Sequence, residues 1–268
     1  MRIPVKTVFA DGIQMNYICF GSGKKTAVII PGLSVKSVLD SAPMIAKDYA
    51  LWTKDFTVYL FDRRSNLPEH YSLADMAEDT FKVIHALALN ELYLFGTSQG
   101  AMISLLLAAG HQELVKKLVI GSGAVKTDKT AEAVIERWRH LAATGDKEGL
   151  YLDFGKKIYP EALFLKYEAA LRILSHDITE EELKRFLILC GALNGFDAGE
   201  DVKSIRCPVL SLHAADDTIF SVKAAQELAK AFEHHPQFQQ YIYPAGYGHA
   251  VYDTADDYKQ RVYEFFKL

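Results

Sequence analysis

The sequence has few cysteines and none of the spacings that are typical of a disulfide-stabilised or zinc-binding protein. Its 268 residues include only three cysteines, Cys19, Cys190 and Cys207, and no Cys-x-x-Cys pair. An odd and sparse set of this kind predicts reduced thiols, and therefore a cytoplasmic protein. The sequence also lacks a His-Glu-x-x-His run and a cysteine–histidine cluster, so we expect no metal site.

Long apolar runs and a strong excess of one charge are also lacking. The most apolar stretch, residues 101–110, is far shorter than the roughly 20 residues that span a bilayer. The N-terminal residues lack the apolar core of a signal peptide. The formal net charge is −4, whereas a nucleic-acid-binding protein usually presents a basic face. We therefore expect neither a membrane nor a nucleic-acid partner.

Strand and helix patterns alternate along a chain of ordinary globular composition, with 50% hydrophobic and 24% charged residues. A hairpin is expected around Asp11-Gly12, and a helix is expected to begin behind Ser72 as its N-cap. Apolar runs typical of buried strands are found at residues 26–30, 56–61, 92–95, 118–120, 207–212 and 238–243. Apolar strands separated by helices predict an α/β fold with a mostly parallel sheet covered on both faces.

The pattern changes between residues 126 and 201, where strand signals vanish and helical stretches take over. We interpret this segment as a helical cap inserted into a core domain formed by residues 1–125 and 202–268. After the last strand, a final helix is expected from about Asp253. The carboxylates of Asp253, Asp256 and Asp257 would then lie in its first turns, where the helix dipole favours anions.

One pentapeptide, Gly96-Thr97-Ser98-Gln99-Gly100, stands where a strand pattern ends and a helix pattern begins. Small residues on both sides of Ser98 permit the sharp, strained turn that exposes a nucleophilic hydroxyl. Free N–H groups at the start of the helix are suited to stabilising an oxyanion. A plain tight turn between strand and helix would give the same pattern, but this setting favours a nucleophile.

A nucleophilic serine needs a base, and the base needs an orienting acid. Among the nine histidines, His249 stands just past the last strand pattern, whereas most of the others fall within or beside helical patterns. Asp216 and Asp217 follow the apolar run at residues 207–212. Loops beyond the carboxyl ends of sheet strands are where α/β sites are assembled. The sequence therefore predicts a triad of Ser98, His249 and one of these two aspartates.

These motifs resemble those of the α/β-hydrolase superfamily over nearly the whole chain outside the helical segment. The matching stretches are Pro31-Gly32-Leu33, Asp62-Arg63-Arg64, the Ser98 pentapeptide, His213-Ala214-Ala215-Asp216-Asp217 and Gly248-His249. The resemblance implies an α/β-hydrolase fold. It also implies that Asp217 is the acid, because the family's acid stands three residues after the position that Ala214 occupies. The N–H groups of Leu33 and Gln99 are expected to form the oxyanion hole.

Two stretches depart from the family pattern. Pro31 stands where the family usually has a histidine, and Asp62-Arg63-Arg64-Ser65-Asn66 replaces an Asp-x-Arg-Gly-x-Gly loop. The two arginines are expected either to brace the loop through hydrogen bonds or to bind an acidic group of the substrate. Of these two roles we favour bracing.

The resemblance implies acyl transfer that needs no metal or organic cofactor. Ser98 is expected to attack the carbonyl of a small-molecule ester, while His249 transfers the proton and Asp217 holds the imidazole. The same residues suit thioesters, lactones, amides and the carbon–carbon bond of diketones. A serine at position 98 argues against haloalkane and epoxide substrates. The alternative of a different class is a binding or signalling protein that retains the hydrolase fold with weak turnover.

Overall fold

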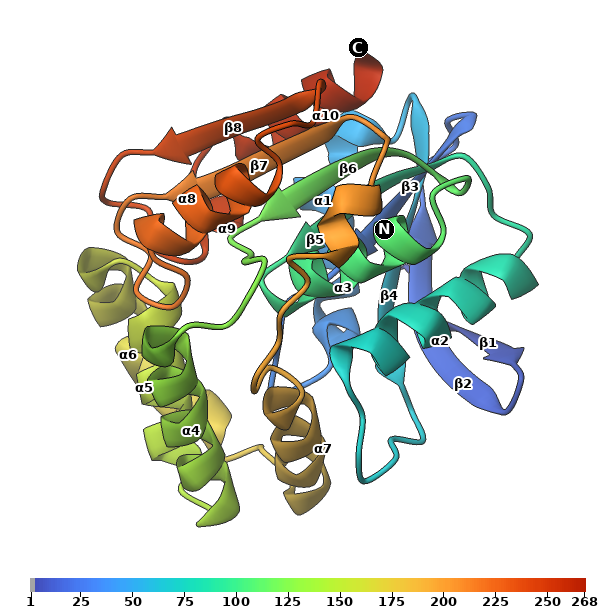
Figure 1. The fold of residues 1–268 in the computed structure, drawn as a ribbon. Coiled ribbons are helices and arrows are strands. Elements are labelled where there is room, and N and C mark those ends of the chain that lie inside the picture. Colours follow the sequence, from blue (N-terminus) through green and yellow to red (C-terminus); the bar gives the residue numbers. More distant parts are fainter. Residues whose placement is uncertain (1–2) are drawn as a thin grey trace.

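A central β-sheet organises the computed structural model, which describes residues 3–268 (Figure 1). Within this range the eight strands follow the spatial order β1-β2-β4-β3-β5-β6-β7-β8. Their bounds are β1 (Lys6–Ala10), β2 (Ile13–Phe20), β3 (Lys25–Ile30), β4 (Phe56–Arg64), β5 (Leu92–Thr97), β6 (Val115–Gly121), β7 (Val209–Ala214) and β8 (Phe238–Tyr243). In this spatial order, all neighbouring strands from β4 through β3 to β8 are parallel. The β1–β2 and β2–β4 pairs are antiparallel. The predicted mostly parallel sheet is confirmed.

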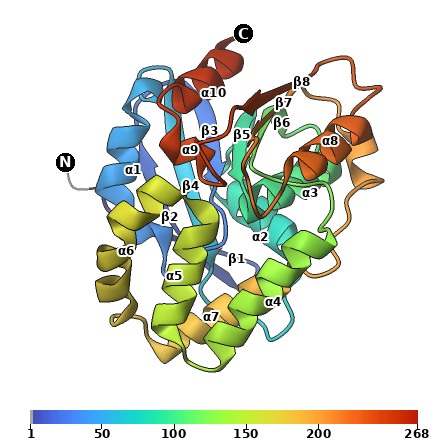
Figure 2. The same cartoon turned by 90° about the vertical axis from the view of Figure 1, so that its left-hand side faces the viewer.

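Helices cover both faces of this sheet (Figure 2). The helices are α1 (Ala42–Asp48), α2 (Leu73–Ala86), α3 (Gln99–Gly110), α4 (Lys129–Ala143), α5 (Lys147–Ile158), α6 (Glu161–Ser175), α7 (Glu180–Gly191), α8 (Val222–Ala231), α9 (Val251–Thr254) and α10 (Tyr258–Lys267). One face packs against α2, α3 and α8, and the other against α1 and α10. The buried side chains accordingly form two apolar groups, one on each face of the sheet.

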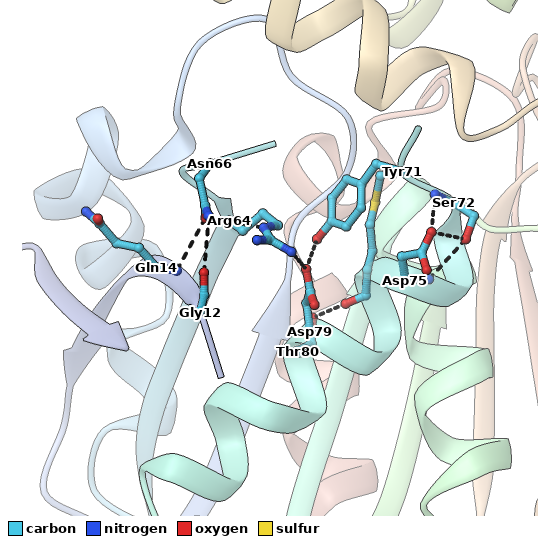
Figure 3. Close-up of polar contacts among 10 residues, drawn as sticks. Gly12, Gln14, Arg64, Asn66, Tyr71, Ser72, Asp75, Asp79 and Thr80 are labelled. Atoms are coloured by element: carbon cyan, nitrogen blue, oxygen red, sulfur yellow. Dashed lines mark hydrogen bonds and ion pairs between the residues drawn. The ribbon is translucent and has the colours of Figure 1, made fainter. Parts of the chain in front are cut away.

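Helix α2 begins where the sequence predicts. Ser72 accepts a hydrogen bond from the N–H of Asp75 at 3.1 Å, and the Asp75 carboxylate accepts one from the N–H of Ser72 at 2.9 Å (Figure 3). This reciprocal capping box satisfies backbone donors that the first helical turn leaves free.

The segment between β6 and β7 is helical, as the loss of strand signals predicts. Its helices α4 to α7 lie together beyond one end of the sheet (Figure 1), with α4 packed against α7 and α5 against α6. A bridge between Lys126 and Asp197 joins the two ends of the segment. The division into a core domain and a cap stays a prediction. In the described part of the chain, no helix is both long enough and apolar enough to cross a membrane.

Three local expectations need correction. Strand β4 does not end before Asp62 but continues to Arg64, because Arg64 still pairs with Met15 of β2. The last helix does not begin near Asp253. The short α9 stops at Ala255, whose backbone is extended, and α10 starts only after Asp257. Helix α1 was not predicted at all.

Candidate active site

Ser98 occupies the single residue between the end of β5 at Thr97 and the start of α3 at Gln99. Its backbone has φ 52° and ψ −123°, a conformation that residues with a side chain rarely adopt. The Ser98 N–H donates to the carbonyl of Gly121 at 2.8 Å, and the Ser98 carbonyl accepts from the N–H of Ala101 at 2.9 Å. Hydrogen bonds on both sides therefore hold the strained turn in place.

The glycine at position 100 is required by close packing. A Cβ atom on Gly100 would collide with the carbonyl oxygens of Ile30 and Pro31, at the end of the neighbouring strand β3. The start of α3 can therefore approach β3 only without a side chain here. This approach brings the Pro31-Gly32 loop against the serine.

The structure brings together Ser98, His249 and Asp217, the aspartate that the family resemblance implies. His249 Nε2 lies 2.9 Å from Ser98 Oγ, and His249 Nδ1 lies 2.8 Å from Asp217 Oδ2. The side chains of His249 and Asp217 are 2% and 0% exposed. The second oxygen of Asp217 accepts hydrogen bonds from the N–H groups of Ile219 at 2.8 Å and Phe220 at 3.0 Å. The carboxylate is therefore fixed on both of its oxygens.

Asp216 lies in a different environment from its neighbour. Its carboxylate accepts hydrogen bonds from the N–H groups of Gly246, Tyr247 and Gly248 at 2.8, 3.4 and 3.0 Å. Those residues form the loop that leads to His249. Asp216 therefore shapes the loop that carries the histidine, and Asp217 contacts the imidazole.

Ser122 is a further residue of the site that the sequence analysis does not predict. Its buried hydroxyl donates to the carbonyl oxygen of His249 at 2.7 Å, and so fixes the histidine backbone. Ser122 directly follows the end of β6 in Gly121-Ser122-Gly123. Its place after a parallel strand was the only local signal that could have revealed it.

Two backbone N–H groups flank the serine. Gly32 lies so close to Ser98 that a Cβ atom on the glycine would be 3.0 Å from Ser98 Cβ and 3.6 Å from Ser98 Oγ. Leu33 follows directly, and Gln99 begins α3 on the other side of the serine. Within residues 3–268, neither the Leu33 N–H nor the Gln99 N–H donates to a protein acceptor. An oxyanion donor must be free of such an acceptor, and both N–H groups meet this condition.

A small apolar cavity of about 30 Å³ opens at Ser98 and His249. Its walls include side chains from the segment between β6 and β7, among them Ile135 and Trp138 of α4 and Phe154 of α5. No Asp, Glu, Lys or Arg of the described chain lines it. The Trp138 and Phe154 rings pack with centroids 4.6 Å apart, and Trp138 Nε1 donates to the Asp153 carboxylate at 3.0 Å. These contacts therefore hold the aromatic wall of the cavity in a fixed orientation.

Both arginines that follow Asp62 make hydrogen bonds within the protein. Arg63 is buried, and its Nη2 donates to the Pro31 carbonyl at 2.7 Å and to Gln99 Oε1 at 3.2 Å. Arg64 forms an ion pair with Asp79 at 3.1 Å, and Asp79 also accepts the hydroxyl of Tyr71 at 2.9 Å (Figure 3). These contacts are those of braces, the role that we favour from the sequence.

Groups suited to a metal do not gather at this site. In the range 3–268, no three His, Cys, Asp or Glu side chains are arranged to hold a metal ion. The three cysteines are all unpaired thiols. Another buried histidine, His213, stands on β7 with Nε2 2.7 Å from Ser211 Oγ. Its burial lowers its pKa to about 4.

Solved structures with the same architecture give the class of fold. MGS-M2, an α/β-hydrolase enzyme from a Medee basin deep-sea metagenome library, is 20% identical with a TM-score of 0.86, and the match covers 98% of both chains. The enol-lactonase from Burkholderia xenovorans LB400 is 16% identical with a TM-score of 0.82, and the match covers 98% of this chain and 100% of the enzyme. The predicted α/β-hydrolase fold is thereby confirmed.

Similarity in sequence then gives the family. The family model described as "Serine aminopeptidase, S33" matches residues 48–254. A relative from Klebsiella pneumoniae (strain 342), named "Putative carbamate hydrolase RutD", is 30% identical over 197 residues, which make up 71% of each chain. The chain therefore belongs to the S33 serine aminopeptidase family of α/β-hydrolases.

Proposed function

We propose that the protein is a serine hydrolase that cleaves a small, uncharged ester through Ser98, His249 and Asp217. The observation that carries this proposal is the unbroken chain of hydrogen bonds from Ser98 Oγ through the His249 ring to Asp217. A nucleophile, a base and an orienting acid in this geometry are what covalent acyl transfer requires. Membership of a hydrolase family supports the same reaction.

In the proposed mechanism, Ser98 Oγ attacks the substrate carbonyl while His249 Nε2 takes the hydroxyl proton. The N–H groups of Leu33 and Gln99 donate to the oxyanion of the tetrahedral intermediate. His249 then gives its proton to the leaving alcohol, and the acyl group remains on Ser98. Water attacks this acyl-enzyme by the same route and releases the acid. The loss of one oxyanion donor typically lowers kcat by about 10²- to 10³-fold.

The cavity supports a short and uncharged substrate. Because roughly 10 to 15 Å³ of such space holds one water molecule, a cavity of about 30 Å³ suits a group of two or three heavy atoms. A carboxylate enclosed by apolar walls would lose its hydration without gaining a charged partner, which costs several kcal/mol, of order 5. We propose that α4 to α7 act as a cap that forms the far wall of this cavity.

Carbamates are a second candidate class. Curated relatives that match most of this chain carry the name of a carbamate hydrolase. A carbamate presents a carbonyl to the nucleophile as an ester does, and its amino group is small and uncharged. The same triad and the same cavity therefore suit both substrates.

Labelling with a fluorophosphonate probe tests the proposal directly. The wild type should be labelled, and Ser98→Ala should not. A series of p-nitrophenyl esters from acetyl to octanoyl, assayed beside simple carbamates, thioesters and lactones, should show fastest turnover of the shortest ester or carbamate. Labelling of Ser98→Ala equal to that of the wild type would overturn the assignment of the nucleophile. A wild type that binds these substrates without turnover would favour a binding protein instead.

A further inference from the structure

The guanidinium of Arg63 contacts both segments that carry the proposed oxyanion donors. Its Nη2 donates to the carbonyl of Pro31, at 2.7 Å, and to Oε1 of Gln99, at 3.2 Å. Pro31 lies two residues before Leu33, and Gln99 supplies the other donor from its own backbone. A single nitrogen atom therefore joins the two sides of the oxyanion hole.

Arg63 is itself held in place by a buried carboxylate. Its backbone N–H donates to Asp62 Oδ1 at 2.8 Å, and the other oxygen of Asp62 accepts the hydroxyl of Ser37 at 2.6 Å. Arg185 of α7 reaches the same carboxylate at 2.6 Å. Burial lowers the pKa of Arg63 to about 10, so the side chain remains charged at neutral pH. Its hydrogen bonds are consequently of the stronger, charge-assisted kind.

Gln99 is tied to α7 as well. Its Nε2 donates to the carbonyl of Leu189 at 2.7 Å, while its Oε1 accepts from Arg63. The first turn of α3 is therefore held between Arg63 on one side and α7 on the other. Each atom of the Gln99 amide that can form a hydrogen bond has a partner, so its orientation is unambiguous.

The loop on the other side has less intrinsic rigidity. Gly32 separates Pro31 from Leu33, and a residue without Cβ has wide backbone freedom. An oxyanion donor is effective only within about 2.7 to 3.1 Å of the oxygen, and an error of about 1 Å at a reacting group can cost 10²-fold in rate. The loop thus needs a contact that limits rotation of the peptide groups before Leu33.

We infer that Arg63 is a positioning residue that sets the spacing between the Leu33 and Gln99 N–H groups. The inference rests on the proposed function, because it concerns the oxyanion hole of that reaction. Arg63 does not line the cavity and touches no reacting atom. It acts through Pro31 and Gln99 on the donors that do.

Arg64 provides a matched control. It is the next residue, carries the same charge, and its guanidinium bonds to Asp79 and Asn66 (Figure 3). Arg64→Met therefore removes a partly buried arginine from the same strand without changing either contact of the oxyanion hole. Arg63→Met removes both contacts, and Arg63→Lys keeps the charge but lacks the planar fork of the guanidinium.

The test compares these three variants on a short ester, with thermal unfolding measured for each. Arg63→Met should lower kcat by about 10- to 100-fold with KM nearly unchanged. It should also lower the affinity for a trifluoromethyl ketone by a similar factor, because the bound ketone mimics the tetrahedral intermediate. Arg63→Lys should recover part of the loss, and Arg64→Met should keep kcat near that of the wild type even if its melting temperature falls.

Wild-type kcat in Arg63→Met would overturn the inference, and so would an equal fall in kcat for Arg63→Met and Arg64→Met. If Arg63→Met does not fold, the decision passes to Arg63→Lys. Unchanged kcat and unchanged affinity for the ketone in that variant would also overturn it. Failure of the proposed function looks different, because the wild type itself would then neither turn over esters nor react with the fluorophosphonate.

Discussion

Replacing Asp217 with asparagine should disable the base while it preserves the shape of the side chain. One oxygen of Asp217 accepts the N–H groups of Ile219 and Phe220, and only an oxygen can do so. The asparagine must therefore turn its NH₂ group toward His249 Nδ1. That nitrogen then has to accept a hydrogen bond, which moves the ring proton to Nε2. In this tautomer His249 Nε2 cannot take the proton of Ser98.

The magnitude follows from the template of the serine triad, where this exchange of aspartate for asparagine lowers kcat by about 10⁴-fold. We expect Asp217→Asn to lower kcat by about 10³- to 10⁴-fold, which corresponds to roughly 4 to 5 kcal/mol in the barrier. Asp216→Asn removes the same charge from the adjacent residue. Both oxygens of Asp216 accept N–H groups of residues 246–248, and neither bonds to the imidazole. The single oxygen of an asparagine can keep the bonds from Tyr247 and Gly248, while the bond from Gly246 is lost. That variant should lose less than about 10-fold.

The assay is ester hydrolysis at saturating substrate, with the fraction of folded enzyme determined by thermal unfolding. Because the two variants carry equal changes in charge and size, Asp216→Asn is the control for Asp217→Asn. Equal losses in the two variants would refute the assignment of the acid. Near-normal kcat in Asp217→Asn would refute the tautomer argument and with it the proposed role of the triad.

Three more predictions follow from the contacts. Phe154→Ala should enlarge the cavity and raise the ratio of kcat/KM for butanoyl esters to that for acetyl esters by about 10-fold or more. Phe164→Ala is the control, because its ring lies outside the cavity, and this ratio should not change in it. Gly248→Ala should lower the free energy of unfolding in urea by about 1 to 2 kcal/mol, because φ is +66° and a Cβ atom would lie 2.9 Å from the backbone nitrogen of residue 160; unchanged stability would contradict this. His213, with its pKa lowered to about 4, binds fewer protons when folded than when unfolded, so stability should fall as pH drops below its unfolded pKa. This group should cost the wild type roughly 2 to 3 kcal/mol of stability between pH 7 and pH 4.5. His213→Gln should show a smaller acid loss in urea unfolding, and the exposed His234→Gln should match the wild type.

Local sequence patterns predict most of the sheet because buried parallel strands are short apolar runs between turns. The limits expected for β8 match those in the structure, and the Ser72 cap begins α2 as expected. Helix α1 has only seven residues, and helices this short depend on packing against the rest of the protein. The break at Ala255, whose side chain is buried and whose backbone is extended, is likewise not marked by a glycine or proline in the sequence.

Some residues of the site can likewise be predicted from their neighbours in the sequence, and others depend on contacts with distant residues. Ser98 is recognisable from its own pentapeptide, because the strain of the turn requires small neighbours. The choice between Asp216 and Asp217 came from resemblance to a family and not from local chemistry. The contacts of Ser122 and Arg63 could not be predicted, because their partners are 127 residues away for Ser122 and 32 and 36 residues away for Arg63.

The strand order explains why Arg63 can reach both sides of the oxyanion hole. In the sheet, β3 lies between β4 and β5, although β4 follows β3 in the sequence. Arg63 is near the carboxyl end of β4, Pro31 follows the end of β3, and Gln99 follows β5 by two residues. A side chain that extends from β4 toward Ser98 must therefore pass the end of β3 before it meets α3. Only a long side chain with several donors can contact the loop after β3 and the helix after β5 together, and Arg63 meets this requirement.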